Sequence, residues 1–528
     1  MSSVIFDDKL TRWLSNQKFY HGYLPREDLP YVLKKKGDYI VRTTERVAQK
    51  IKRRDCVLSI AWPAAPTAML TTKDIKNILI EKNGANYFLE QTMQFTTIEA
   101  LFDHYRHNDL INQSKEKMRL IKPVGLLSWE YKHSQIMCVK KVGQGAYGEV
   151  YKGKVKKGTK TFDAAIKAMR KDLDAGDEKM KEVMAEARLM RSLNHPNIVR
   201  CRGIAVLEQP LYIVIDFITG GGLDSFLKKN GSTLTIDQKN KMGISAAWGI
   251  EFMHSQDIIH RDIAARNCLY DKKNLVKLSD FGLSRKGSVY KMKKAMKMPT
   301  RWLAPESLST FTFSRASDVY TFGVLLYEIY TCEEPYLGAN GGDARKKILA
   351  GQFPDFEKNA PPELYSIIKK KIYQLDPAKR APMNEIVKNL EQWLDVELVM
   401  DPGEKQPEAD PESNRAQQQV QNKSEDSNFT NLPTKTVAPL PPVPPPQSQT
   451  GGPAVKSKIE TLPVKNSKEH EPTPEMASTS VLHKMVNSDS RDMDALQPPQ
   501  EDVVPSPSRE TESIGETPKS KSQEKDKN

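Results

Sequence analysis

The residues best suited to chemistry are His260-Arg-Asp-Ile-Ala-Ala-Arg-Asn267, with Asp280-Phe-Gly282 following at a short distance. In a phosphoryl-transfer site, one carboxylate accepts the proton of the substrate hydroxyl, while a second carboxylate and an amide oxygen hold Mg²⁺ against the nucleotide phosphates. Asp262 fits the first role, and Asp280 with Asn267 fits the second. A lone His-Arg-Asp tripeptide is usually a solvated turn, but the full pattern favours phosphoryl transfer.

Such a site needs groups that hold the nucleotide, and a glycine-rich segment upstream could supply them. Residues 137–142 read as a strand that runs into Gly143-Gln-Gly-Ala-Tyr-Gly148, whose glycines let backbone N–H groups approach phosphates. GxGxxG alone is a weak signal, because dinucleotide-binding folds share it. Those folds open a helix there, whereas residues 149–155 continue as a strand, which favours a lid over the phosphates. The expected nucleotide contacts here are Val142, Gly143, Gln144, Gly145, Ala146, Tyr147, Gly148, Glu149 and Val150.

Together these segments resemble the eukaryotic protein kinases, and Ala264-Ala-Arg266 before the asparagine is similar to their tyrosine-specific branch. The resemblance implies a bilobal protein kinase fold over residues 136–397, with ATP and Mg²⁺ as cofactors and Mn²⁺ as an alternative metal. It also implies that Asp262 is the catalytic base and that Arg266 helps to seat a tyrosine side chain.

Further positions follow from the same resemblance. Lys167 ends an apolar strand, where a lone lysine usually faces solvent, but the family places its nucleotide lysine here. Glu186 lies in a segment of helical spacing and matches the glutamate that pairs with that lysine. Glu306 is expected to pair with Arg380. The hinge that meets adenine is expected at Ile215, Asp216 and Ile218.

The stretch between Asp280 and Pro299 is rich in Lys and Met and poor in periodic pattern, which predicts a mobile loop. It leads into Pro299-Thr-Arg-Trp302, which resembles the substrate platform of tyrosine kinases. Tyr290 lies among six basic residues, with no acidic residue between positions 284 and 298. A phosphate there could gather these cations, so Tyr290 is the expected autophosphorylation site, the alternative being an exposed loop tyrosine.

Residues 19–123 alternate short strands and helices, as a compact α+β module does. Residues 39–42 and 56–60 have the character of strands, whereas residues 26–36 and 97–107 have helical spacing. Arg42 ends an apolar strand, where a lone charge is costly to bury, so an anionic partner is expected. That partner is either an internal carboxylate or a ligand.

The module resembles an SH2 domain along its whole length, through His21-Gly22, Arg26, the segment from Gly37 to Arg42 and the segment from Phe95 to Tyr105. The resemblance implies that Arg42 grips the phosphate of a phosphotyrosine bidentately. It implies that Arg26, Thr43 and Thr44 complete the pocket. Asn77 stands where a His is common, so the pocket is expected to depend more on Arg26.

An SH2-like module followed by a connector at residues 124–135 and a tyrosine-kinase-like region is similar to the Fes/Fer kinases. Trp129-Glu130 and the segment from Gly143 to Tyr151 share the style of that group. In the kinase-like region, Tyr320, Tyr373 and Ala381 depart from the family pattern. These departures concern packing rather than chemistry.

The segment from residue 398 to residue 528 differs in composition from the rest. Beyond residue 400 it holds 19 of the 34 prolines and Phe429 as its only aromatic residue, so too little apolar surface is present to offset chain entropy. A disordered tail is therefore predicted. Pro439 to Pro446 fits the polyproline geometry that SH3 or WW proteins bind, although a stiff spacer explains it equally well.

Charge and cysteine content limit the class of protein. The net charge of +13 divides into about +19 before residue 401 and about −6 after it, and the five cysteines form no CxxC pair. No nucleic-acid module accompanies the basic charge, so phosphorylated and acidic ligands explain it better. Residues 1–18 show no signal-peptide pattern, and no apolar run approaches the ~20 residues of a membrane span. These features predict a cytoplasmic protein, with peripheral recruitment to the inner face of the plasma membrane left open.

The fold expected is thus an α+β multidomain chain: an SH2 module, a bilobal kinase fold and a disordered tail. The function expected is that of a non-receptor tyrosine kinase, targeted or regulated by phosphotyrosine proteins and acting on protein tyrosines. The alternative is a catalytically inactive pseudokinase adaptor. Such adaptors usually lose the lysine or an aspartate of the site, whereas Lys167, Asp262, Asn267 and Asp280 are all present here.

Overall fold

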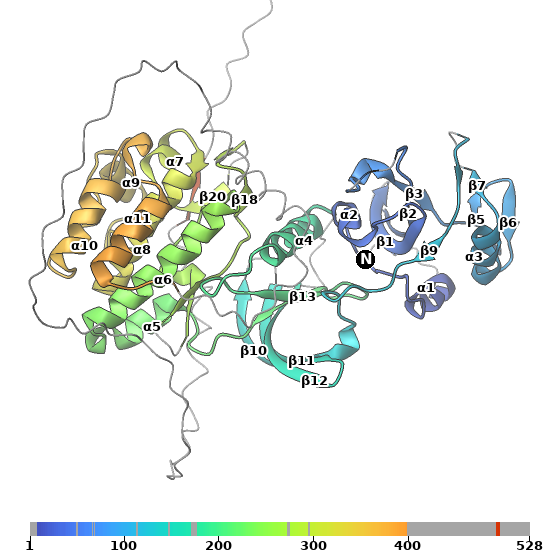
Figure 1. Cartoon of the computed structure of the whole chain (residues 1–528), viewed down its shortest axis with the longest axis horizontal. Helices are drawn as coiled ribbons and strands as arrows, with labels where there is room; N and C mark the ends of the chain where they lie inside the picture. Colours follow the sequence, from blue (N-terminus) through green and yellow to red (C-terminus); the bar gives the residue numbers. More distant parts are fainter. Residues whose placement is uncertain are drawn as a thin grey trace, which may run out of the picture.

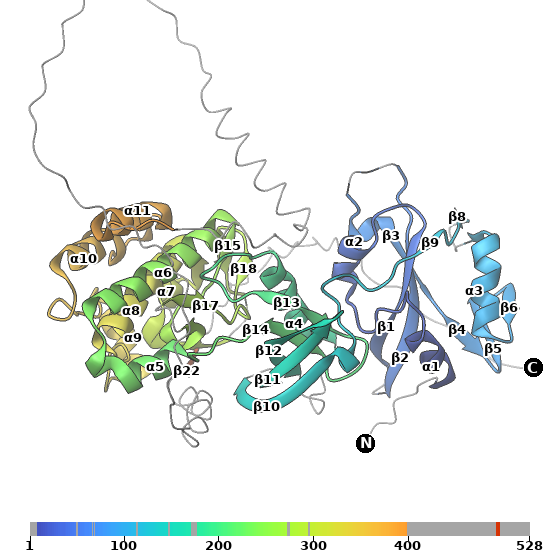
Figure 2. The ribbon, with the colours of Figure 1, turned by 60° about the horizontal axis from the view of Figure 1, so that its bottom comes forward.

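The computed structural model of the chain describes residues 8–48, 51–65, 67, 69–111, 115–145, 148–169, 177–271, 275–293, 296–398 and 493–496. These residues form three bodies in a row, an N-terminal module and two lobes, with helix α4 (Asp177–Arg191) between the module and the lobes (Figure 1). The same order is seen from a second direction (Figure 2). Residues 399–492 and 497–528, which include the segment from Pro439 to Pro446, lie outside the described residues.

The N-terminal module is built on a four-stranded sheet in the order β3-β2-β1-β9. Antiparallel pairing places Arg42 opposite Val57. Its strands are β1 (Asp38–Ala48), β2 (Ile51–Ala61), β3 (Ile75–Leu79) and β9 (Lys122–Pro123). Helix α3 (Ile98–His107) begins at Thr97, whose hydroxyl accepts the N–H of Ala100, as its helical spacing predicts. Smaller strands complete the module: β4 (Glu81–Asn83), β5 (Asn86–Glu90), β6 (Met93–Phe95), β7 (Leu110–Ile111) and β8 (Lys117–Met118).

In the N-terminal part of the chain, one expected helix is shorter than predicted, and one helix was not predicted. The helix expected over residues 26–36 is only a 3₁₀ turn (Arg26–Asp28) and α2 (Leu29–Val32). It ends early because the carboxylate of Asp38 accepts the backbone N–H groups of Lys34 and Lys35, at 3.0 and 2.9 Å, and holds them in a turn. Within the N-terminal segment, α1 (Asp8–Ser15) packs on the module, where Trp13 stacks on Phe102 at 5.4 Å.

The first lobe is a five-stranded sheet in the order β10-β11-β12-β14-β13, with α4 against it. Its strands are β10 (Ile136–Gly145), β11 (Gly148–Lys157), β12 (Lys160–Met169), β13 (Cys201–Ala205) and β14 (Tyr212–Asp216). The glycine-rich segment is the β10–β11 hairpin, as the sequence predicts. Gly148 is needed there because a Cβ atom would lie 1.8 Å from the carbonyl oxygen of Ala168.

The second lobe is mainly helical, with α6 (Ile236–Ser255) and α8 (Arg315–Thr331) buried at its centre. Thr235 and Gln238 form the predicted capping box at the start of α6. The remaining helices are α5 (Leu223–Asn230), α7 (Pro305–Ser309), α9 (Gly341–Leu349), α10 (Pro362–Ile367) and α11 (Met383–Leu394). The short strands β15 (Ile258–Ile259), β16 (Cys268–Tyr270) and β17 (Val276–Leu278) carry the loops that face the first lobe.

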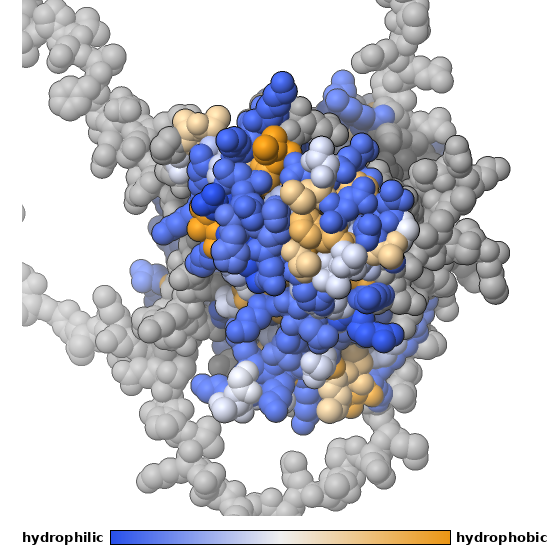
Figure 3. Space-filling view, turned by 90° about the vertical axis from the view of Figure 1, so that its right-hand side faces the viewer, coloured by the Kyte–Doolittle hydropathy of each residue, from blue (hydrophilic) through white to orange (hydrophobic). Residues whose placement is uncertain are grey.

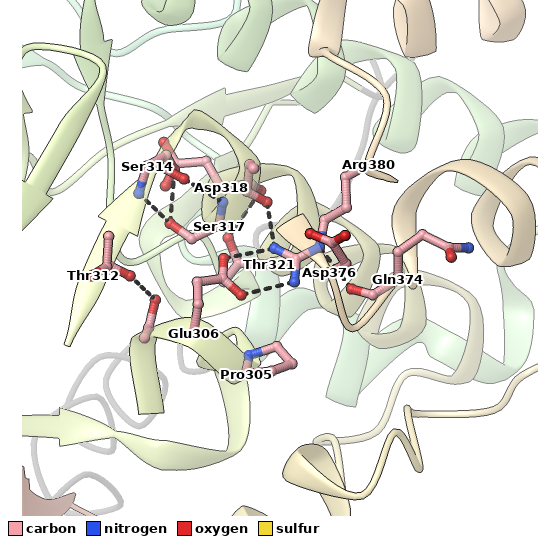
Figure 4. Close-up of polar contacts among 12 residues, drawn as sticks. Pro305, Glu306, Thr312, Ser314, Ser317, Asp318, Thr321, Gln374, Asp376 and Arg380 are labelled. Carbon is pink, nitrogen blue, oxygen red and sulfur yellow. Dashed lines mark hydrogen bonds and ion pairs between the residues drawn. The ribbon is translucent and has the colours of Figure 1, made fainter. Parts of the chain in front are cut away.

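A buried ion pair fixes α7 to the end of the second lobe, as predicted. Arg380 donates to both carboxylate oxygens of Glu306, at 2.7 and 2.8 Å, and also to the carbonyl of Gln374 (Figure 4). The two tyrosines that depart from the kinase pattern, Tyr320 and Tyr373, pack against each other at 5.6 Å. Both rings contact Phe353, at 5.5 and 5.2 Å, so the altered residues build an aromatic cluster.

The stretch between Asp280 and Pro299 is more ordered than the sequence suggests, because its backbone pairs with neighbouring segments. Strand β18 (Arg285–Lys286) pairs with β15, and β19 (Val289–Lys291) pairs with β21 (Thr312–Ser314). Strand β20 (Met296–Pro299) pairs with β22 (Met493–Leu496), which comes from the tail. The sequence predicted none of these strands, neither those between Asp280 and Pro299 nor the one at residues 493–496.

The module and the lobes share one apolar core. Residues from the module, such as Leu29, Val32 and Ile40, belong to the same buried cluster as Val183 and Ala187 of α4. By contrast, the face of the module that is turned away from the lobes is largely hydrophilic, with scattered apolar areas (Figure 3). The module therefore keeps an apolar core of its own and buries a second part of its apolar surface against the first lobe.

Gly22 lies where the backbone of the module contacts the first lobe at Val206. Its φ is +54°, and a Cβ atom there would lie 2.2 Å from the carbonyl oxygen of Val206. The neighbouring Tyr23 donates its N–H to that same oxygen at 2.8 Å. Only glycine satisfies both the backbone conformation and the contact.

We expect Gly22→Ala to destabilise the protein by several kcal/mol, because the methyl group adds a clash to the ~1–2 kcal/mol cost of a left-handed residue. Gly84→Ala is the matched control, since Gly84 has a φ of +58° with nothing within 4 Å of an added Cβ. Thermal unfolding of both variants measures the difference. Equal losses would show that the module does not contact Val206 in solution.

Candidate active site

The loop that carries Asp262 is held by one buried carboxylate at the start of α8. Asp318 accepts the backbone N–H groups of His260 and Arg261, at 2.7 and 2.9 Å. It also lies 3.1 Å from Nε2 of His254 on α6. Arg261 has a φ of +72°, a strained conformation for a residue with a side chain, and the contacts from Asp318 hold it there.

The carboxylate of Asp262 is oriented by two neighbours in its own loop. Asn267 donates from Nδ2 to Oδ2 of Asp262 at 2.6 Å, and Arg266 donates to Oδ1. The guanidinium of Arg266 lies over the ring of Trp302, 4.5 Å from its centre. The expected catalytic base, the residue expected to seat tyrosine and the substrate platform therefore meet at one point.

Oxygen atoms suitable for Mg²⁺ lie beside this carboxylate. Because Nδ2 of Asn267 donates to Asp262, its Oδ1 is left as an acceptor, and the backbone of Ser279 donates to the carbonyl of Asn267 at 2.9 Å. Ser279 precedes Asp280, which the fold thereby places near Asn267, with a φ of +55°. A carboxylate and an amide oxygen are hard ligands of the kind Mg²⁺ prefers, so these residues fit the metal.

The lysine and glutamate expected to serve the nucleotide are in contact. Nζ of Lys167 lies 2.8 and 2.9 Å from the two carboxylate oxygens of Glu186 on α4. Burial raises the pKa of Glu186, Lys167 opposes this, and Asp280 adds a further increase because its charge is close. Lys167 and Glu186 of the first lobe thus lie close to Asp280 of the second lobe.

The remaining expected nucleotide contacts line the same region of the first lobe. Ile215 and Asp216 end β14, where the side chain of Asp216 pairs with Arg202 and its N–H donates to the carbonyl of Arg200 at 3.0 Å. Glu149 pairs with Lys141 across the β10–β11 hairpin. Ala146 and Tyr147 lie outside the described residues. The structure also places these expected contacts on the same hairpin or hinge: Val142, Gly143, Gln144, Gly145, Gly148, Val150 and Ile218.

Glu328 on α8 is a residue that the sequence argument missed. It is buried and accepts the N–H of Ala265 at 2.8 Å, so it holds the loop between Asp262 and Asn267. Burial raises the pKa of Glu328 to about 7, although Ala265 and Arg266 oppose the change. The available signal was a single charged residue in the apolar run from Phe322 to Tyr330.

The side chain of Arg261, beside the catalytic base, contacts the ring of Tyr290. The guanidinium of Arg261 lies 4.3 Å from the centre of the Tyr290 ring, and that of Arg285 lies 5.7 Å away. Arg261 is 2% exposed, and within the described part of the chain its Nε and Nη2 atoms have no hydrogen-bond partner. Burial and the nearby Arg285 lower the pKa of Arg261 to about 10. Two cations, Arg261 with its unused donors and Arg285, thus face the expected autophosphorylation site.

The second expected site is the pocket of Arg42 in the N-terminal module. Arg42 is buried and donates from Nε to Ser59 at 3.2 Å and from Nη2 to Asn77 at 3.1 Å. Asn77, expected only to weaken the pocket, therefore orients this arginine. Arg26 is exposed and donates to the carbonyl of Thr72.

The expected role of Thr43 in this pocket needs a correction. Successive side chains of β1 point to opposite faces, so Thr43 faces away from Arg42. Its hydroxyl is 2.8 Å from that of Tyr20 in the core. Thr44 lies on the same face of the strand as Arg42, and its side chain is partly exposed.

Comparison with known proteins agrees with this geometry. Residues 136–390 match the family described as protein tyrosine and serine/threonine kinase. Fer-related kinase 1 of Caenorhabditis elegans is 33% identical over 394 residues, which cover 74% of this chain and 97% of that protein. This chain belongs to the Fes/Fer family of protein tyrosine kinases.

Other members of the Fes/Fer family show similar identity over different shares of their length. The transforming protein Fps of an avian sarcoma virus is 32% identical over 71% of this chain and 68% of the viral protein. The human tyrosine-protein kinase Fer is 32% identical over 71% of this chain, but the match spans only 44% of human Fer. None of the helices in the described part of this Fes/Fer-type chain combines the length and apolar character needed to cross a bilayer.

The raised pKa of Glu328 makes the stability of the kinase domain depend on pH. The native state holds a proton up to a pH of about 7, whereas the unfolded chain releases it near 4.5, so the free energy of unfolding falls as pH rises between these values. The full loss is on the order of 3 kcal/mol. Glu328→Gln stays neutral and keeps an acceptor for Ala265. In urea unfolding from pH 5 to pH 8, we expect this variant to gain stability relative to the wild type as pH rises.

Glu385→Gln is the control for this measurement, because Glu385 is exposed beside Lys371. Its difference from the wild type should stay constant with pH. A constant difference for Glu328→Gln as well would contradict a buried, protonated carboxyl beneath the catalytic loop.

Proposed function

We propose that the protein transfers the γ-phosphoryl group of MgATP to tyrosine hydroxyls of proteins. The observation that carries the proposal is the Asp262 carboxylate, held by Arg266 and Asn267 while Lys167 is already paired with Glu186. An inactive adaptor would not need both arrangements. They favour an enzyme over a binding protein that only shares the fold.

The proposed reaction assigns one task to each group. The tyrosine oxygen attacks the γ-phosphorus, the bond from that phosphorus to the oxygen bridging it to the β-phosphate breaks, and ADP leaves. Asp262 accepts the phenolic proton, while Arg266 and the Trp302 ring beneath it position the tyrosine. Lys167 holds the phosphates of ATP. Asn267 and Asp280 would hold Mg²⁺, which would supply positive charge to the phosphate oxygens.

We further propose that the N-terminal module is an SH2 domain that binds phosphotyrosine at Arg42. A planar guanidinium held by Ser59 and Asn77 is oriented to offer paired donors to a phosphate. Arg26 is exposed and Thr44 lies on the same face of β1 as Arg42, and we propose that both contribute to binding the same phosphate. The partners implied are phosphotyrosine proteins, in the cytoplasm or at the inner face of the plasma membrane.

The proposed SH2 domain is coupled to catalysis through α4. Asp28 of the module is buried and accepts two hydrogen bonds from Arg188, at 3.0 and 2.9 Å, with Arg191 at 3.5 Å. Arg191 also lies 3.7 Å over the ring of Trp129 in the connector. Arg188 and Glu186 belong to the same helix, so these contacts support the position in which Glu186 reaches Lys167. We infer that the module promotes rather than restrains activity.

Tyr290 is the proposed autophosphorylation site. A phosphate on its hydroxyl would add about −1.5 to −2 charge beside the unused donors of Arg261 and beside Arg285. Neutralising the buried Arg261 and the partly exposed Arg285 would stabilise the strands β18 and β19. The phosphate would thereby fix the platform that follows them.

For the transfer reaction, we expect Asp262→Asn to lower kcat by ~10²–10⁴-fold, because it removes the proton acceptor. ATP affinity should change little, since Asp262 does not hold the nucleotide. Purified protein with labelled ATP, Mg²⁺ and a tyrosine-containing polymer provides the assay. Wild-type turnover in the variant would refute the assigned base.

For the SH2 proposal, we expect Arg42→Lys to weaken phosphotyrosine-peptide binding roughly 10-fold or more, because lysine keeps the charge but loses the planar fork. Calorimetry measures this. Arg106→Lys is the control, since Arg106 is an exposed arginine paired with Asp103. If both variants bind as tightly as the wild type, phosphotyrosine is not read at Arg42.

For the switch, Tyr290→Phe should lower peptide phosphorylation several-fold after preincubation with ATP, and mass spectrometry of the wild type should locate phosphate on Tyr290 first. Tyr365→Phe, on α10, serves as the control. Full activity of the Tyr290→Phe variant, while Tyr290 of the wild type is phosphorylated, would place the switch elsewhere.

A further inference from the structure

Four residues of the tail are part of the folded kinase domain. Met493–Leu496 form β22, which pairs antiparallel with β20 in the register Met296 with Leu496, Lys297 with Ala495, Met298 with Asp494 and Pro299 with Met493. Neither the catalytic mechanism nor the module requires this pairing. It therefore needs an explanation of its own.

The position of β20 shows what this pairing covers. Met298 is fully buried in the second lobe and anchors the strand. Directly after Pro299 comes the turn Thr300–Trp302, whose Trp302 lies under Arg266, and Arg266 contacts Asp262. An extended segment on the edge of β20 therefore lies beside the strand that leads into the Trp302 turn, which is linked to Asp262 through Arg266.

The register also gives the direction of the tail strand. Met493 is opposite Pro299, so β22 begins at the end of β20 nearest the catalytic loop. The residue just before it in sequence is Asp492, and the whole tail from residue 401 contains no tyrosine. A segment that follows this path can occupy the platform without offering a hydroxyl of the accepted kind.

Charge favours the same pairing. The stretch from Asp489 to Asp494 carries three aspartates and one arginine. Residues 284–298 carry six Lys or Arg and no acidic residue. Backbone pairing supplies affinity to an added strand, and this opposite charge supplies selectivity for it.

We propose that Met493–Leu496 is an internal pseudosubstrate that binds the edge of β20 and competes with protein substrates for it. This inference rests on the proposed kinase function, since it describes the regulation of that same site. Its occupant is an extended acidic and apolar segment of the chain itself. Competition raises the apparent KM for a protein substrate and leaves ATP binding and kcat unchanged.

Two proline variants of the full chain test the competition. The N–H groups of alternate residues in β22 face β20, so one of the two N–H groups of Asp494 and Ala495 does so. The double variant Asp494→Pro, Ala495→Pro removes that group. Met476→Pro with Ala477→Pro makes the same chemical change elsewhere in the tail. For a peptide substrate, we expect KM to fall several-fold in the first variant only, with kcat and the KM for ATP unchanged in both. An unchanged peptide KM in the first variant overturns the inference.

A binding measurement separates this inference from the kinase proposal. A fluorescent peptide of residues 488–499 is titrated into the wild type and into the Asp494→Pro, Ala495→Pro variant. We expect it to bind the variant at least several-fold more tightly, because its site is vacated. Equal binding to both proteins, or to neither, overturns the pseudosubstrate. Tight binding without any phosphoryl transfer counts against the catalytic proposal alone.

A third variant tests the position of the segment. Asp492→Tyr places an acceptor hydroxyl immediately before β22. We expect phosphate at position 492 at a rate independent of protein concentration, as for an intramolecular reaction. Phosphate there only at a rate that rises with concentration would show that the tail reaches the site of another molecule, which contradicts the proposal.

Discussion

The active site depends on one buried carboxylate that takes no part in the chemistry. Asp318 stands at the start of the central helix α8 and binds the backbone of His260 and Arg261, which fixes the residue that follows, Asp262. A buried charge is tolerated there because every oxygen has a donor. Glu328, from the same helix, holds the far end of the loop at Ala265. Helix α8 thus holds the catalytic loop at two points, through Asp318 and Glu328.

Helix α4 positions the residues expected to hold the nucleotide, and it contacts both the first lobe and the N-terminal module. On one surface of α4, Glu186 pairs with Lys167, and on another surface, Arg188 pairs with Asp28 of the module. A cavity of about 360 Å³ lies where Tyr31, α4 and the segment from Phe281 to Lys286 converge. The module, the nucleotide lysine and the segment that leads to Tyr290 therefore meet at α4, which suits it to transmit the proposed phosphotyrosine binding to catalysis.

Sequence patterns correctly predicted the contacts between residues that belong to motifs of fixed spacing. The loop around Asp262, the pairing of Lys167 with Glu186 and that of Glu306 with Arg380 follow from motifs whose spacing a folded chain must satisfy. Glu328 and Asn77 were missed as positioning residues, because each acts through a contact distant in sequence. Thr43 was misplaced because strand alternation was not applied to it. The order of β18 to β20 could not be foreseen, since it depends on pairing with segments that have no pattern of their own.

The apolar core that joins the module to α4 also affects how the protein unfolds. When two domains are linked only by a connector, each loses its structure in a separate step. Here Leu29, Ile40 and Val183 belong to one cluster, and the buried Asp28 pairs with Arg188 at the same boundary. Separating the domains would expose that surface and leave Asp28 without its partner, so melting one destabilises the other. The module and the first lobe thus form a single cooperative unit, and neither can be exchanged for a homologous domain without matching its surface.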